Sequence, residues 1–343
     1  MRLTGKTGPA RAFGAAGAVL LSCALFLGAA RADDTYVMKI TLPTLNDAPH
    51  QYAKDYAAAV EKDSGGRIKA EVYPASQLGS IPRQIEGVQF GAIQCAIIPP
   101  DFFVGVDERF EVMAAPGLVA TLEQGQRVAG DPEVRKLMLG LGADKGLHGA
   151  GLFIAAQSAI IARSPIRHLV DFKGKKIRVF ASDFQSEAMR RLGATPVALT
   201  LGDVLPAIQQ GAIDGAVAAV PVFTNMQFQD AAKYVTETGQ PAIFILVTVN
   251  KKWFTTLPPD LQKIVQDDAA KEDAAINPWA TDYDEKARGV WTGKGGELIS
   301  LPPEEQSSMM EGLASVGEDV SKKKPAVAAA YQIVTAAAKR VQH

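Results

Sequence analysis

The distribution of hydrophobic and polar positions predicts alternating strands and helices in the first part of the chain after residue 35. Residues 36–42 (YVMKITL) and 67–73 (RIKAEVY) alternate apolar with polar side chains, and 95–98 (CAII) form a short apolar run, so we predict three strands there. Residues 50–63 and 80–90 place apolar side chains at helical spacing. The order strand, helix, strand, helix, strand with short connections favours a mainly parallel sheet.

A second set of strands and helices begins about 80 residues after the first ends. We predict strands over 176–180, 195–199 and 214–220, and helices over 183–192 and 203–210. Asp183 and Asp203 are the expected N-caps of these two helices, because a carboxylate can accept the free N–H groups of a first helical turn.

A near-repeat of six residues, GAIQCA at 91–96 and GAIDGA at 211–216, occurs once in each set. Each copy follows an amphipathic run and precedes an apolar one, and Gly91 and Gly211 are expected to supply the left-handed residue that ends each helix. The repeat therefore marks the same helix-to-strand step in two separate α/β lobes.

Further segments are predicted to join and cover these lobes. The strand-like segments 147–156, 158–163 and 242–250 run between them, and at least two crossings predict a multi-strand hinge rather than a flexible tether. The pattern over 260–290 predicts a long bridging helix, which Pro278 should kink. The tail over 302–343 is predicted to be mostly helical.

The N-terminus predicts export. Three basic residues within the first eleven precede an apolar stretch over 13–29, and an A-x-A sequence at 30–32 follows, so we expect a signal peptide over 1–32 that is cleaved after Ala32. A membrane anchor is the first alternative, but the stretch is short for one and rich in glycine. A lipoprotein attached through Cys23 is the second, although Leu21 fits that cleavage sequence poorly.

Composition excludes several classes of partner and chemistry. The 343 residues carry 36 Lys and Arg against 37 Asp and Glu, a formal net charge of −1, so nothing points to nucleic acid. Cleavage after Ala32 would leave Cys95 as the single cysteine, which excludes an internal disulfide. No histidine spacing typical of zinc, no G-x-S-x-G and no phosphate or dinucleotide loop occurs, so we predict no metal, no cofactor, no catalytic residue and no enzyme.

Two α/β lobes, a hinge and an export signal describe a cleft that closes on a small molecule. Five stretches then carry a resemblance to the solute receptors of TRAP transporters of the DctP type: SGGRIKAEVYPASQLG (64–79), VQFGAIQ (88–94), KGKKIRV (173–179), RLGATPV (191–197) and AIQQGAIDG (207–215). The resemblance implies an α/β, two-lobe, periplasmic-binding-protein-like fold of type II-like form. We expect lobe one over 33–155 and about 242–284, and lobe two over 157–241 and about 285–343.

The same resemblance implies a periplasmic receptor that binds a small organic anion and delivers it to the membrane subunits of a TRAP permease. In this family the arginine of the K-I-R-V motif, here Arg178, reads the ligand carboxylate, and a guanidinium fork matches a carboxylate well. An exported enzyme on the same frame, or the binding protein of an ATP-driven importer, remain the alternatives.

Two departures from the family pattern bear on the ligand. Where many members carry a second arginine in the hinge strand, this chain has Gln157 or Ser158. Where many members carry a polar asparagine just after the strand that begins at Asp214-Gly215, this chain has an apolar run that includes Val220 and Pro221. Both changes remove polar contacts, so the pattern favours a monocarboxylate with an apolar or aromatic body. The phenylalanines expected to pack on such a body, core packing being their alternative role, are Phe102, Phe103 and Phe180.

Overall fold

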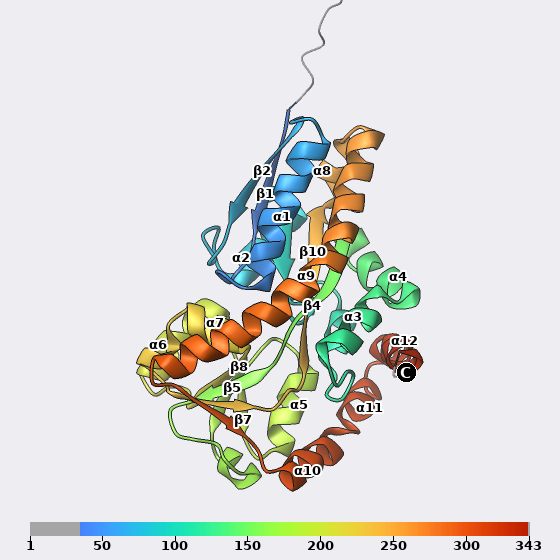
Figure 1. Cartoon of the computed structure of the whole chain (residues 1–343). Helices are drawn as coiled ribbons and strands as arrows, with labels where there is room; N and C mark the ends of the chain where they lie inside the picture. The colour runs from blue at the N-terminus through green and yellow to red at the C-terminus, as the bar shows by residue number, and fades with distance from the viewer. Residues whose placement is uncertain (1–34, 342–343) are drawn as a thin grey trace, which may run out of the picture. The chain divides into compact units, whose positions relative to one another are not determined.

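The structure, a computed structural model, describes residues 35–341. The predicted signal peptide, its cleavage after Ala32 and the alternative at Cys23 lie outside the described residues. Two separate β-sheets form the framework, and helices cover both (Figure 1). One continuous sheet through both halves would have contradicted the two-lobe prediction, so the predicted fold class is confirmed.

The first sheet has five strands in the order β2-β1-β3-β10-β4. Strand β1 (Tyr36–Thr41) pairs in parallel with β2 (Ile68–Tyr73) and β3 (Cys95–Ile98). Strand β10 (Ala242–Asn250) lies antiparallel to both β3 and β4 (Leu147–Gln157). The parallel prediction is therefore correct for the first three strands only, because β10 returns from the second sheet and enters in the opposite direction.

The second sheet has six strands in the order β11-β9-β5-β8-β6-β7. In chain order these are β5 (Ala159–Ala162), β6 (Lys176–Val179), β7 (Thr195–Ala198), β8 (Gly215–Ala218), β9 (Tyr234–Glu237) and β11 (Glu297–Ser300). Ser158 alone separates β4 from β5, and residues 238–241 separate β9 from β10. The chain thus crosses between the sheets through two short connections, as the predicted hinge requires.

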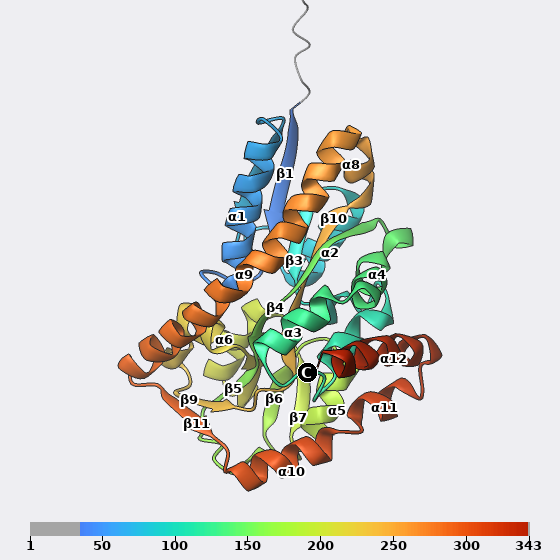
Figure 2. The same ribbon diagram turned by 45° about the vertical axis from the view of Figure 1, so that its right-hand side comes forward.

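Helices from distant parts of the chain cover the sheets. They are α1 (Ala48–Asp63), α2 (Ile81–Phe90), α3 (Leu122–Gly130), α4 (Pro132–Gly140), α5 (Asp183–Arg191), α6 (Leu201–Gln209), α7 (Val220–Asn225), α8 (Lys251–Thr256), α9 (Pro259–Gly293), α10 (Pro303–Leu313), α11 (Val316–Ser321) and α12 (Pro325–Arg340). Helix α12 packs against α3 and α4, as Figure 2 shows. None of the helices within 35–341 is long and apolar enough to cross a bilayer.

The helix ends confirm one local prediction and correct another. Gly91 and Gly211 adopt left-handed backbone, with φ of 87° and 71°, where α2 and α6 end. Asp183 and Asp203 are not the N-caps, however. The N-caps are Ser182, whose hydroxyl accepts the Gln185 N–H at 3.4 Å, and Thr200. Both aspartates lie in the first turn instead, where the helix dipole also favours negative charge.

Helix α9 is the predicted bridge. Its first half packs on α1, where the Tyr56 hydroxyl donates to the Val265 carbonyl at 2.9 Å, and its second half packs on α7, where Thr224 Oγ1 donates to the Ala287 carbonyl at 3.2 Å. Pro278 lies inside the helix, which changes direction along its length in Figure 1.

Pro278 has no N–H to donate to the carbonyl of Ala274, four residues earlier in the helix. The side-chain amide of Gln126 donates to this carbonyl at 3.4 Å.

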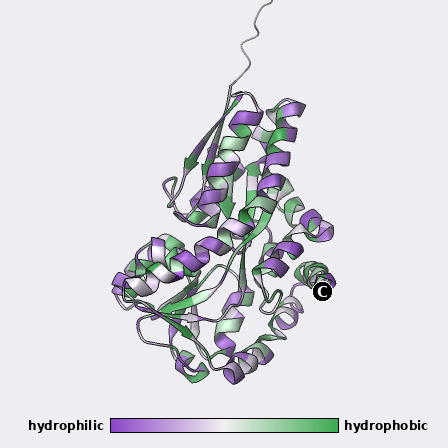
Figure 3. Cartoon of the chain, viewed as in Figure 1, coloured by the Kyte–Doolittle hydropathy of each residue, from purple (hydrophilic) through white to green (hydrophobic). Residues whose placement is uncertain are grey.

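Two apolar cores hold the elements together, and Figure 3 shows hydrophobic residues concentrated on the strands and on the helix faces toward them. One core lies between the first sheet and helices α1 and α9, and contains the buried Cys95. The other packs the opposite side of the first sheet and continues into the second sheet. The exact lobe boundaries, 33–155 with 242–284 and 157–241 with 285–343, stay a prediction.

Candidate functional site

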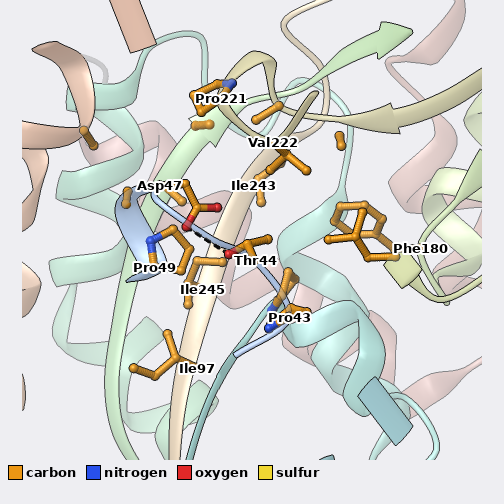
Figure 4. Close-up of a pocket in the computed structure, with 18 of the residues that line it drawn as sticks. Pro43, Thr44, Asp47, Pro49, Ile97, Phe180, Pro221, Val222, Ile243 and Ile245 are labelled. Carbon is orange, nitrogen blue, oxygen red and sulfur yellow. Dashed lines mark hydrogen bonds between the residues drawn. The ribbon is translucent and has the colours of Figure 1, made fainter. Parts of the chain in front are cut away.

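A cavity lies between the two sheets, with a volume of about 690 Å³ including the part open to solvent. Its walls come from both sides: β3, β4 and β10 contribute Ile97, Ala156 and Ile245, whereas β8 and α7 contribute Ala218 and Val222. Figure 4 shows the labelled side chains pointing into this space, and most of them are hydrophobic. A mostly apolar cavity with few polar groups is the common form of a small-molecule site.

Arg178 is held rigidly at the wall of this cavity. It lies in β6, between β7 and β8, and its side chain is only 1% exposed. Nε donates to the Leu199 carbonyl and Nη1 to the Val217 carbonyl, both at 2.9 Å. Two backbone acceptors therefore determine the plane of the guanidinium before any ligand arrives.

The remaining donor atom, Nη2, has no hydrogen-bond partner among the described residues, and no carboxylate of residues 35–341 lies within ion-pair distance of the guanidinium. Burial lowers the pKa of Arg178 to about 9, and the more distant Asp101 carboxylate opposes this shift in part. At neutral pH the group is still a cation. A desolvated, unneutralised cation beside an apolar cavity attracts an anion strongly.

Two phenylalanine rings pack against this cation. The Phe180 ring centroid lies 4.7 Å from the guanidinium carbon and that of Phe102 lies 5.9 Å from it, and the two rings stack on each other at 5.1 Å. Both line the cavity. Phe103 does not line the cavity. It is fully buried in the core, and its ring centroid lies 5.4 Å from that of Phe110.

The other residues named from the sequence lie elsewhere, except Pro221, which lines the same cavity. Gln157, Ser158 and Val220 line a second, more polar cavity between β5 and the segment after β9. The Gln157 amide donates to the Ala120 carbonyl at 2.6 Å, and Ser158 Oγ is buried without a partner in the described chain. The structure thus brings together Arg178, Phe180, Phe102 and Pro221 but not the rest.

Sequence reasoning missed three polar residues of the main cavity: Thr44, Asp47 and Tyr283. Asp47 is the N-cap of α1, where its Oδ1 accepts from the Thr44 hydroxyl at 2.9 Å (Figure 4) and from the His50 N–H at 3.2 Å. Burial raises its pKa to about 6. An aspartate two residues before Pro49 is a recognisable cap, but nothing local shows that it faces a cavity.

The buried carboxylate of Asp101, which follows β3, is linked by hydrogen bonds to α5 and to Phe180 near Arg178. Asp101 Oδ1 accepts from the Gln185 amide at 3.1 Å, and Gln185 Oε1 accepts from the Phe180 N–H at 3.0 Å. Burial raises the pKa of Asp101 to about 7. Because the folded chain then binds a proton more tightly than the unfolded chain, the ionised form of Asp101 costs stability, which falls as pH rises from about 4 through 7.

This gives a prediction for Asp101→Asn. The amide cannot ionise, so we expect a higher melting temperature than wild type at pH 8 and a difference that disappears toward pH 4, where Asp101 is protonated. Calorimetric melting temperatures of the empty protein between pH 4 and 8 measure it. A difference that is the same at every pH would show that the charge of Asp101 is not disfavoured.

Two sheets joined by crossing strands, with an apolar cavity and a fixed cation between them, define a two-lobe solute-binding protein. A sequence profile for the DctP family, described as bacterial extracellular solute-binding protein, family 7, matches residues 41–324. The chain therefore belongs to this family, and the resemblance carried by the five motifs is confirmed.

Known proteins with similar sequence or structure agree. The chain is 30% identical over 60% of its length to YiiZ, an uncharacterized protein of Salmonella typhimurium, and this alignment spans 64% of YiiZ. It is 28% identical over 90% of its length to the C4-dicarboxylate-binding periplasmic protein DctP of Rhodobacter capsulatus, covering 92% of that protein. A TRAP periplasmic solute-binding protein from Desulfovibrio salexigens, with bound orotic acid, superimposes with a TM-score of 0.84 at 22% identity, over 90% of this chain and 100% of that one.

Proposed function

We propose that this protein captures a small monocarboxylic acid between its lobes and delivers it to a TRAP-type membrane permease. The observation that carries the proposal is Arg178: a buried guanidinium, fixed by two backbone carbonyls, with Nη2 unused by the described chain and the cavity beside it. The Rhodobacter and Desulfovibrio proteins support a carboxylic acid as the ligand, because one is named for dicarboxylates and the other holds orotic acid, but the choice of a monocarboxylate rests on the cavity.

The cavity favours one carboxylate over two. Arg178 is the only basic residue among its described lining residues, and the others are mainly proline, alanine, isoleucine and phenylalanine. A second carboxylate would lose its water without gaining a cation, which costs several kcal/mol, on the order of the penalty for any unpaired buried ion. An apolar or aromatic body would instead replace water against Phe102, Phe180 and the isoleucines.

Export, the permease and the absence of catalysis belong to the same proposal. The signal sequence over 1–32, with cleavage after Ala32, would place the receptor in the periplasm, and attachment through Cys23 is the competing form. An exported enzyme is the competing function. Neighbouring genes for one small and one large membrane subunit would favour a TRAP system, and a neighbouring ATPase gene would favour an ATP-driven importer.

Ligand capture is tested directly on the purified protein. Mass spectrometry of the solute released on denaturation should detect a monocarboxylic acid, and the same acid should raise the melting temperature of the protein after refolding without it. At a hundred times the dissociation constant, the stabilisation is about 2.7 kcal/mol. Chemical conversion of the bound acid would overturn the receptor assignment in favour of an enzyme.

A further inference from the structure

Asp47 is the one acidic residue among the described residues that line the cavity, and the protein uses only one of its two carboxylate oxygens. Both hydrogen bonds that it receives, from the Thr44 hydroxyl and the His50 N–H, go to Oδ1. Oδ2 accepts from no other residue of the described chain, and Asp47 is one of the residues that line the cavity (Figure 4). The residue as a whole is 3% exposed.

A second capping aspartate in the same protein shows that this arrangement is not required for capping. Asp131, the N-cap of α4, accepts from the N–H groups of Glu133 and Val134 through Oδ1, and its Oδ2 pairs with Arg340 at 2.6 Å. There both oxygens have partners. Since asparagine or serine caps a helix as well as aspartate does, capping alone does not explain a buried carboxylate at position 47.

The cavity wall therefore carries two polar groups of opposite character, which come from different parts of the fold. Arg178, from the second sheet, offers a cationic donor, and Asp47, from the connection between β1 and α1, offers an acceptor. Apolar side chains, among them Val222 and Ile243, line the same cavity. A plain carboxylic acid would pair with Arg178 and leave the Asp47 carboxylate desolvated without a donor, and a dicarboxylate would add a further negative charge to the cavity that holds Asp47.

We propose that the cavity selects acids that carry a hydrogen-bond donor, a hydroxyl or an N–H, on the part of the molecule that faces Asp47. This inference rests on the proposed function, because it takes Arg178 as the group that binds the acid. It adds a specificity residue, Asp47, that distinguishes hydroxy or amino acids from unsubstituted acids of the same shape.

The test compares matched acids on the purified protein by calorimetry. The probes are phenylacetate against para-hydroxyphenylacetate and para-aminophenylacetate, and straight-chain acids of several lengths against their ω-hydroxy and ω-amino counterparts. For at least one pair we expect the donor-bearing acid to bind about ten- to a hundredfold more tightly, the usual effect of a hydrogen bond to a charged group. In Asp47→Ala that preference should fall to less than about threefold.

Two further variants guard against a folding defect and identify the donor. Asp47→Asn keeps the cap and a neutral acceptor, so it should retain binding of a hydroxy acid better than that of an amino acid. Asp131→Asn changes a capping aspartate away from the cavity and should leave every affinity unchanged.

The possible failures are distinguishable. Equal binding of donor-bearing and unsubstituted acids by wild type, with both lost in Arg178→Ala, would overturn the role of Asp47 and leave the receptor function standing. If neither these probes nor any acid released from the protein binds, the proposed function fails, and this inference fails with it.

Discussion

Arg178→Ala should abolish binding of the acid. Removing one partner of a desolvated, hydrogen-bonded charge pair costs about 2–5 kcal/mol, or roughly 30- to several-thousand-fold in affinity. In this protein Nε and Nη1 already bind the Leu199 and Val217 carbonyls, so the ligand would lose a donor whose orientation the fold has determined in advance. Calorimetry with the acid identified from the purified protein measures the change.

Arg178→Lys should restore only part of the affinity. An ammonium group cannot bind two carbonyls in one plane and present a further donor to a carboxylate, so the charge returns without the geometry. The matched control is Arg190→Ala on the exposed face of α5, which should leave affinity unchanged.

We expect the fold of Arg178→Ala to survive, because burial lowers the pKa of this guanidinium and its charge is therefore disfavoured in the empty protein. Circular dichroism checks the fold. Near wild-type affinity in Arg178→Ala would show that another group binds the carboxylate.

Among the substitutions proposed for this protein, Asp273→Ala should cause the largest loss in the free energy of unfolding. This buried carboxylate of α9 accepts from Arg135 at 2.8 Å, from the Leu152 N–H at 3.0 Å and from the Tyr52 hydroxyl at 3.1 Å, and so joins α9 to α4, β4 and α1. Alanine would leave all three donors without this acceptor. Breaking a buried ion pair from one side costs about 3–5 kcal/mol.

Denaturant unfolding followed by circular dichroism measures this loss, with Asp267→Ala as the control. Asp267 lies on the same helix, but it is exposed and pairs only with Lys263, so the control should change stability by less than about 0.5 kcal/mol. Equal effects of the two substitutions would show that the carboxylate of Asp273 does not hold the helix in place.

The stability that Asp273 contributes depends on pH. Burial raises the pKa of Asp273 to about 6 even though Arg135 opposes the shift, so ionising Asp273 lowers the stability of the folded protein. The loss in Asp273→Ala should therefore be smaller at pH 8 than at pH 5, and the comparison with Asp267→Ala is made at both pH values.

Local sequence determined those features whose cause lies within a few residues. The strands over 36–42 and 95–98 follow from apolar patterning, and Gly91 and Gly211 take the left-handed conformation that few other residues adopt. The motif around Arg178 also identified the family, and through it the fold. Short α3 and α4 were not predicted, because their apolar positions are too few to indicate a helix without the surface on which they pack.

Only the tertiary structure decided which side chains meet in the cavity. Val220 and Pro221 are neighbours in the chain, yet they line different cavities, and Gln157 turns to the Ala120 carbonyl instead of toward Arg178. From the local sequence Asp47 is recognisable only as a helix cap, and its second carboxylate oxygen becomes significant only because residues of β6 and β8 line the same cavity. The physical reason is that a cap or a turn depends only on the neighbouring backbone. A binding site depends on how the two sheets are placed against each other, and each sheet combines strands that lie more than 100 residues apart in the chain.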